Sequence, residues 1–147
     1  MTRAARLPLS AAALLLTATA CVPAPQVQPV EVWEGHAQVL LTRQQYRLTF
    51  TVNGGTHDLR GTLENLSSRD RFLVAGTALS AGDGREVSMT VTAQDGVRLN
   101  ASILGFGFTN LSLKANAVLS ARQTGRTMTG KLNVNGLGYP ITLTRVQ

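Results

Sequence analysis

Few side chains in this chain of 147 residues could move a proton or bind a metal: two histidines, eight carboxylates and one cysteine. His36 and His57 are the candidates for a metal or proton-transfer site. A zinc site needs three or four converging ligands, and two imidazoles without a thiol partner fall short of that. We therefore predict no metal site and no cofactor, and we expect both histidines to lie on the surface beside carboxylates.

The four aspartates do not form a pattern typical of an enzyme. Asp58, Asp70, Asp83 and Asp95 lie mostly in turn-forming segments, where aspartate side chains cap backbone amides. No spacing indicates two carboxyl groups facing each other, as glycoside hydrolysis requires. A Gly-x-Ser-x-Gly elbow and a Gly-rich phosphate loop are both missing from the sequence. We expect no catalytic residues, and an envelope hydrolase is only a remote alternative.

The first 20 residues have the three parts of an export signal. Arg3 and Arg6 form a basic segment, residues 7–17 are mostly apolar, and Ala18-Thr19-Ala20 forms a small-residue cleavage site. The apolar run is shorter than the roughly 20 residues that span a bilayer. We therefore predict a signal peptide over residues 1–20 and an exported mature chain that begins at Cys21.

Cys21 is the only cysteine and directly follows the predicted cleavage site. The segment Ala18-Thr19-Ala20-Cys21 resembles the lipobox of bacterial lipoproteins, with alanine in place of the commoner leucine at its first position. The resemblance implies that Cys21 carries a diacylglycerol thioether, so that several acyl chains hold the protein in a membrane. The alternative is a soluble periplasmic or secreted protein whose Cys21 is unmodified.

Residues 21–30 contain Pro23, Pro25 and Pro29 among small and polar residues, without any charge. Such segments favour extended conformations of about 3.1 Å per residue, so nine residues reach roughly 28 Å. We predict a tether between a lipidated Cys21 and a domain over residues 31–147. Alternatively, part of this segment packs against the first strand.

From Glu31 onward, apolar and polar residues alternate with a period of two, and no stretch has the period of a helix. Turn signals such as Asn53-Gly54-Gly55, Asp95-Gly96 and Asn135-Gly136 separate the alternating runs, and they favour antiparallel hairpins. The sequence therefore predicts an all-β domain, a single antiparallel meander of about nine strands. These are near residues 32–41, 45–52, 57–66, 71–80, 85–93, 97–104, 111–120, 126–134 and 138–145.

Strands with one apolar face must close into a barrel or pack as two layers. We predict a closed or partly flattened β-barrel, because sequential hairpins close it without long crossovers. A two-layer sandwich is the first alternative. A β-trefoil is the second, because similar segments start at Val39, Ala78 and Val118, 39 and 40 residues apart.

Many residues predicted to face inward are small, including Gly35, Ala37, Gly61 and Ala75. They could let a narrow barrel close tightly, or they could leave a cavity for an apolar ligand such as an acyl chain. If a cavity is present, we expect aromatic side chains to line it: Trp33, Tyr46, Phe50, Phe106 and Phe108.

Arginine dominates the charge of the mature chain. Without Arg3 and Arg6, the chain has 12 basic and 8 acidic side chains, which gives a net charge of +4. The alternation places the arginines singly on outer faces: Arg43, Arg47, Arg60, Arg69, Arg71, Arg85, Arg98, Arg122, Arg126 and Arg145. A tethered basic domain is attracted to anionic headgroups or acidic envelope polymers. Nucleic-acid binding is not expected, because the aromatic residues alternate onto the apolar face.

These observations favour a lipid-anchored protein of the cell envelope, on its periplasmic face or at the cell surface. Its β-domain would be structural or would bind a protein partner without catalysis. The main alternative is a carrier for an apolar ligand held inside the barrel.

Overall fold

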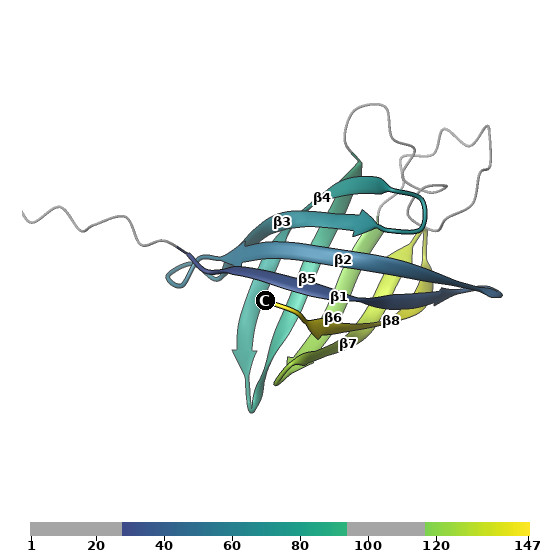
Figure 1. Cartoon of the computed structure of the whole chain (residues 1–147). Coiled ribbons are helices and arrows are strands. Elements are labelled where there is room, and N and C mark those ends of the chain that lie inside the picture. The colour runs from purple at the N-terminus through teal and green to yellow at the C-terminus, as the bar shows by residue number, and fades with distance from the viewer. Residues whose placement is uncertain (1–27, 94–116) are drawn as a thin grey trace, which may run out of the picture.

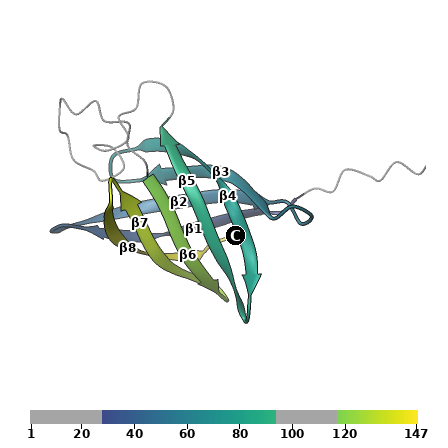
Figure 2. The same cartoon turned by 180° about the vertical axis from the view of Figure 1, so that it is seen from behind.

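The computed structural model describes residues 28–93 and 117–147. They form eight strands (Figures 1 and 2): β1 Val30–Val39, β2 Thr42–Val52, β3 Asp58–Asn65, β4 Asp70–Ala81, β5 Gly84–Ala93, β6 Ala117–Thr124, β7 Thr127–Val134 and β8 Leu137–Arg145. No helix in these two ranges is long and apolar enough to cross a membrane. Residues 1–27, and with them the predicted signal peptide and most of the predicted tether, lie outside the described residues.

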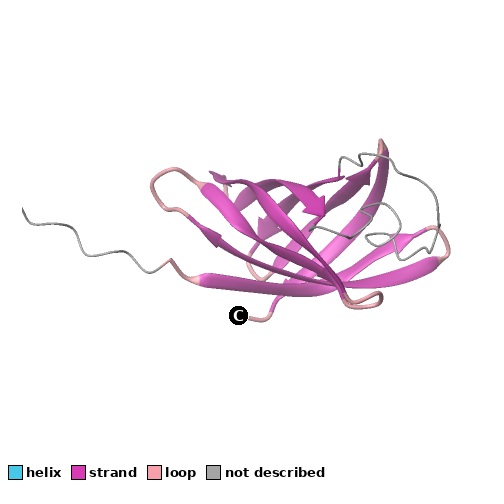
Figure 3. Ribbon diagram, turned by 90° about the horizontal axis from the view of Figure 1, so that it is seen from above, coloured by secondary structure: helices cyan, strands magenta, loops and turns pink. Residues whose placement is uncertain are grey.

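Each strand pairs antiparallel with the next, and β8 pairs back to β1, so the sheet closes into a barrel (Figure 3). This confirms the predicted all-β antiparallel meander and excludes the sandwich and the trefoil. The wall has eight strands rather than about nine. β5 pairs directly with β6 from Arg85↔Gln123 to Val91↔Ala117, so no further strand separates them. The predicted strand at residues 97–104 lies outside the described residues.

Turn chemistry explains most of the hairpins. Asn135 and Gly136 both have positive φ, 51° and 83°, as a type I′ turn requires. Gly82 and Gly125 supply the single positive φ in the two-residue turns before β5 and β7. In the longer connection between β2 and β3, the Asn53 Oδ1 accepts bonds from the Gly55 and Thr56 amides.

The first hairpin is tighter than the sequence predicts. The predicted strand continued to Leu41 with that side chain facing inward, but β1 ends at Val39 and Leu41 is 97% exposed. Val39 pairs with Thr42, so Leu40 and Leu41 form a two-residue turn. Leu40 adopts a φ of +52°, a conformation that costs a residue with a Cβ roughly 1–2 kcal/mol. The prediction was wrong here because the turn contains no glycine, asparagine, aspartate or proline.

The inward side chains form one hydrophobic cluster. Its largest members are fully buried, and they come from every strand except β8: Trp33, Tyr46, Leu48, Phe50, Leu59, Leu63, Phe72, Met89, Leu119, Met128 and Leu132. Eight strands enclose an interior just wide enough for side chains to fill. Ala75, predicted to face inward, is exposed, and the inward position beside it on β4 belongs to Gly76.

Four inward glycines mark places where neighbouring strands approach closely: Gly35, Gly61, Gly76 and Gly130. A Cβ at Gly61 would lie 1.9 Å from the Thr49 carbonyl oxygen, and a Cβ at Gly130 would lie 2.1 Å from the Ser120 carbonyl oxygen. Glycines at such positions let a sheet bend sharply enough to close. At these four positions, the small residues therefore close a narrow barrel rather than line a cavity.

Candidate functional site

The two ends of the barrel differ in which parts of the chain they carry. We call one the tether end, because β1 begins there, and it also carries the connections 53–57, 82–83 and 125–126 and the C-terminus. The distal end carries the turns 40–41, 66–69 and 135–136. Figure 1 shows the start of β1 on the left and the β1–β2 turn on the far right. The segment at residues 28–29 therefore joins the barrel at the tether end.

Ionisable side chains face the interior at the tether end, among them two arginines that were predicted to lie on outer faces. The Glu31 carboxylate accepts hydrogen bonds at Oε2 from the Arg85 guanidinium at 2.7 Å and the Trp33 indole at 3.2 Å. Arg85 also donates through Nε to Gln123 Oε1 at 2.8 Å. The side chain of Glu31 is 9% exposed and that of Arg85 is 21% exposed. This pair joins β1 to β5 across the interior, 54 residues apart in sequence.

Two arginines of this cluster lie against the aromatic core. Arg85 lies over the Phe50 ring at 5.7 Å, and Arg145 lies over the Trp33 ring at 6.0 Å. We call Glu31, Arg85, Gln123 and Arg145 the tether-end plug. The prediction that Arg85 and Arg145 face outward was wrong: both lie on the same side of their strands as the core residues Val87 and Leu143. That parity is visible in the sequence and could have located them.

The aromatic side chains proposed to line a ligand cavity lie inside the barrel, as far as they are described. Trp33 and Tyr46 are 0% exposed and Phe50 is 1% exposed. A void large enough for water would leave accessible area on the side chains around it, so these three pack against other atoms. Burial raises the pKa of the Tyr46 phenol, which keeps it neutral. Phe106 and Phe108, like Cys21, lie outside the described residues.

The histidines do not come together. His36 lies on the outer face of β1, where its Nδ1 is 2.8 Å from the Arg43 guanidinium, so a cation rather than the expected carboxylate is its partner. His57 lies in the connection before β3 with a φ of +62°. Among the described residues, no three histidine, cysteine, aspartate or glutamate side chains gather where they could hold a metal ion.

Carboxylates on the outer wall mostly form ion pairs with arginine. Glu34 accepts from Arg47 at 2.7 Å, and Glu86 accepts from Arg122 at 2.7 Å. These hydrogen bonds raise the pKa values of the Arg47 and Arg122 guanidinium groups above the ordinary value for arginine. Exposed pairs of this kind contribute little to stability.

Exposed leucines characterise the distal end. Leu40 is 69% exposed, Leu41 97% and Leu137 62%, and we call these three residues the distal rim. Two exposed arginines, Arg43 beside the first turn and Arg69 in the β3–β4 turn, lie at the same end. These are the three most exposed large apolar side chains of the described residues, although Val30 (48%) and Val146 (51%) are exposed at the tether end as well. Exposed apolar side chains that gather in one place are typical of a contact surface. The positive φ of Leu40 supports this, because backbone strain is concentrated at functional positions.

Replacing Leu40 with glycine should stabilise the isolated protein by about 1 kcal/mol, because glycine adopts a positive φ without the steric cost of a Cβ. The midpoint of urea unfolding measures this. Leu41→Gly is the matched control, because Leu41 has a negative φ, and it should give no stabilisation. If both variants changed stability equally, Leu40 would not be strained.

No protein-family model matches this chain, and no curated protein matches it either. A chain in the crystal structure of the isotype 1 transferrin binding protein B (TbpB) from serogroup B Neisseria meningitidis aligns with a TM-score of 0.39 and 19% sequence identity. The alignment covers 80% of this chain but only 24% of that chain. A likeness at this TM-score is too weak to support an inference about function.

Proposed function

We propose that this protein is a lipid-anchored, non-catalytic domain of the cell envelope that binds a protein partner through its distal rim. The observation that carries the proposal is the polarity of the barrel. The chain enters at one end, close to the predicted tether, and Leu40 and Leu41 protrude at the other. A domain attached through Cys21 would thus present these leucines away from its membrane.

The interior chemistry supports a non-catalytic role. The buried Glu31 carboxylate already accepts from two donors, and Arg85 is engaged with both Glu31 and Gln123. A general acid or base needs a group that can reach a substrate and exchange its proton there. The inward pair of Glu31 and Arg85 instead stabilises itself.

Packing of the interior argues for a binding surface outside the barrel rather than a ligand within it. Trp33, Tyr46 and Phe50 are in contact with other buried side chains. A carrier would keep such side chains partly accessible to its ligand. The exposed apolar area of the described residues lies outside the barrel, on the rim and at scattered wall positions such as Leu73 and Leu79.

Site-specific photo-crosslinking in intact cells tests the partner surface. A crosslinking residue at Leu41 or Leu137 should capture the same envelope protein, whereas crosslinkers at Thr129 and Thr142 on the outer wall should not. The captured protein, once purified, should bind the wild-type domain. It should bind the Leu41→Asp variant at least about tenfold more weakly, because the new carboxylate would be desolvated at an apolar contact.

Thermal unfolding of Leu41→Asp provides the folding control. It should match that of wild type, because the side chain at position 41 has almost no contact with the barrel. Equal crosslinking from rim and wall, or undiminished binding by Leu41→Asp, would contradict the rim as the contact surface.

A further inference from the structure

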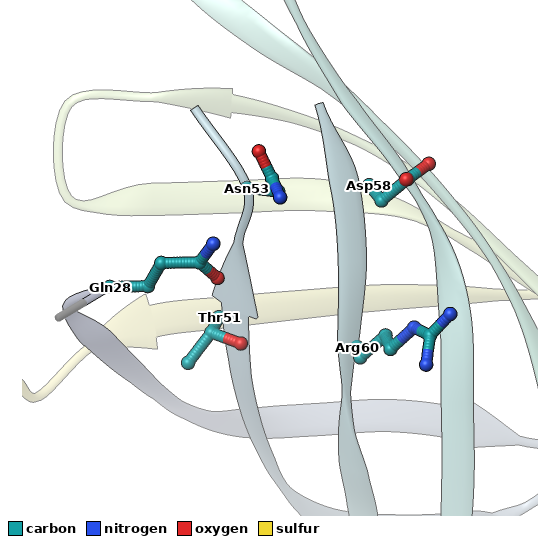
Figure 4. Close-up of a pocket in the computed structure, with 5 residues that line it drawn as sticks. All are labelled: Gln28, Thr51, Asn53, Asp58 and Arg60. Atoms are coloured by element: carbon teal, nitrogen blue, oxygen red, sulfur yellow. The ribbon is translucent and has the colours of Figure 1, made fainter. Parts of the chain in front are cut away.

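A polar cleft lies on the outer surface at the tether end (Figure 4). It has a volume of about 180 Å³ and is lined by Gln28, Thr51, Asn53, Asp58 and Arg60. Thr51 and Asn53 come from the end of β2, Asp58 and Arg60 from the start of β3, and Gln28 from the segment that leads into β1. At about 30 Å³ per water molecule, the cleft has room for roughly six waters, the size of a small polar group.

No described residue neutralises either of the two charges in this cleft. Arg60 forms no ion pair or hydrogen bond with any described residue, whereas Arg47, Arg71, Arg85 and Arg122 each pair with a carboxylate. Asp58 accepts a hydrogen bond at Oδ2 from the Thr56 hydroxyl at 2.7 Å, but it forms no ion pair with a cationic side chain of the described residues. Arg60 and Asp58 are two residues apart on the same face of β3 and still do not pair.

Neutral hydrogen-bonding groups complete the cleft. The Asn53 Oδ1 is occupied by the Gly55 and Thr56 amides at 2.9 and 3.2 Å, which leaves the Nδ2 protons for a ligand. The Thr51 hydroxyl and the Gln28 amide add further donors and acceptors. Arg60 and Asp58 line one side of the cleft, from β3, and the neutral groups line the other side (Figure 4). One unpaired cation and one unpaired carboxylate, with neutral hydrogen-bonding groups beside them, complement a compact zwitterion with an anionic group at one end and an ammonium at the other.

The position of the cleft selects among such zwitterions. Gln28 lies in the wall of the cleft, seven residues after Cys21. A fully extended chain of that length spans at most about 23–25 Å, so Gln28 lies no farther than this from Cys21. If Cys21 is anchored as proposed above, the wall of the cleft lies within that distance of the anchoring membrane. We propose that it binds the phosphoethanolamine headgroup of that membrane, with Arg60 on the phosphate and Asp58 on the ammonium. This inference rests on the proposed anchor for the source of the ligand, but not for the chemistry of the cleft.

The test uses the mature chain with Cys21→Ser, which has no lipid, so binding is measured independently of the anchor. Titration with phosphoethanolamine should shift the amide NMR signals of Thr51, Asn53 and Arg60. Affinity for phosphocholine should be weaker by about tenfold, because a quaternary ammonium cannot donate a hydrogen bond to Asp58. Arg60→Gln and Asp58→Asn should each cost about tenfold, whereas Arg69→Gln, an exposed arginine at the distal end, should change nothing.

Vesicles distinguish a membrane headgroup from a free metabolite. The same protein should float with vesicles that contain phosphatidylethanolamine and not with pure phosphatidylcholine vesicles. Binding of inorganic phosphate as tight as that of phosphoethanolamine, or no effect of Asp58→Asn, would reduce the cleft to an anion site and overturn the proposal. Binding of soluble phosphoethanolamine without any flotation would overturn the membrane source. Failure of the rim crosslinks or of Cys21 acylation would leave these measurements unchanged, so the two proposals fail separately.

Discussion

Replacing Gly61 with alanine should lower the free energy of unfolding by at least about 3 kcal/mol, or prevent folding altogether. The new Cβ would lie 1.9 Å from the Thr49 carbonyl oxygen and 2.7 Å from the Phe50 Cα, both on the paired strand β2. These are backbone atoms in a continuous hydrogen-bonded ladder, so they cannot move away as a flexible side chain would. Overpacking of a core costs 1–3 kcal/mol even where side chains can adjust.

Gly54→Ala is the matched control for this substitution. A Cβ at Gly54 meets nothing within 4 Å, and this glycine has a negative φ. Its effect should stay within about 0.5 kcal/mol, as for other exposed positions. Urea unfolding followed by tryptophan fluorescence compares the two variants, since Trp33 lies in the core. Equal stability of Gly61→Ala and Gly54→Ala would show that the close approach of β2 and β3 is not required for closure.

Replacing Arg85 with methionine should destabilise the barrel by about 2–4 kcal/mol. The methionine can still cover the Phe50 ring, but Glu31 would remain largely buried without its cation, and an uncompensated buried charge is costly. Of the two side chains that donate to Glu31 Oε2, Arg85 and Trp33, the variant would keep the Trp33 indole. The free energy of unfolding in urea at neutral pH measures the effect.

Two comparisons separate the charge from the packing. Arg47→Met breaks the exposed pair with Glu34 and should leave the free energy of unfolding nearly unchanged, because solvent screens an exposed pair. Adding Glu31→Gln to Arg85→Met removes the stranded charge and keeps an acceptor for the Trp33 indole. This double variant should regain at least half of the lost stability. If Arg85→Met cost no more than Arg47→Met, the tether-end plug would not contribute to stability.

Period-two alternation and the turn signals were enough to predict the antiparallel meander, because every strand then has one face in the core. Closure into a barrel was favoured by the sequential hairpins and is shown by the pairing of β8 with β1. The inward positions of Trp33, Tyr46 and Phe50 follow directly from the alternation. The turn at Asn135–Gly136 was predictable for a local reason, since few residues other than asparagine and glycine tolerate two successive positive φ angles. Such features depend on residues adjacent in sequence.

Features that depend on register were not predictable. The Leu40–Leu41 turn has no turn-forming residue, so alternation appeared to continue through it. Glu31 and Arg85 have inward parity, but their contact requires that β1 and β5 face each other across the barrel. The cleft likewise combines Gln28, Thr51 and Arg60 through the pairing of three strand ends, which no linear spacing reveals.

Attachment of the chain at Cys21 is the central claim of this account, because it gives the tether end and the distal rim their roles. The most direct test is the intact mass of the native protein extracted from membranes, with fragmentation of its N-terminal peptide. We predict a mature chain that begins at Cys21 and carries a diacylglycerol group, and we predict that Cys21→Ser releases the protein from the membrane. A native chain with an unmodified Cys21 would contradict the account.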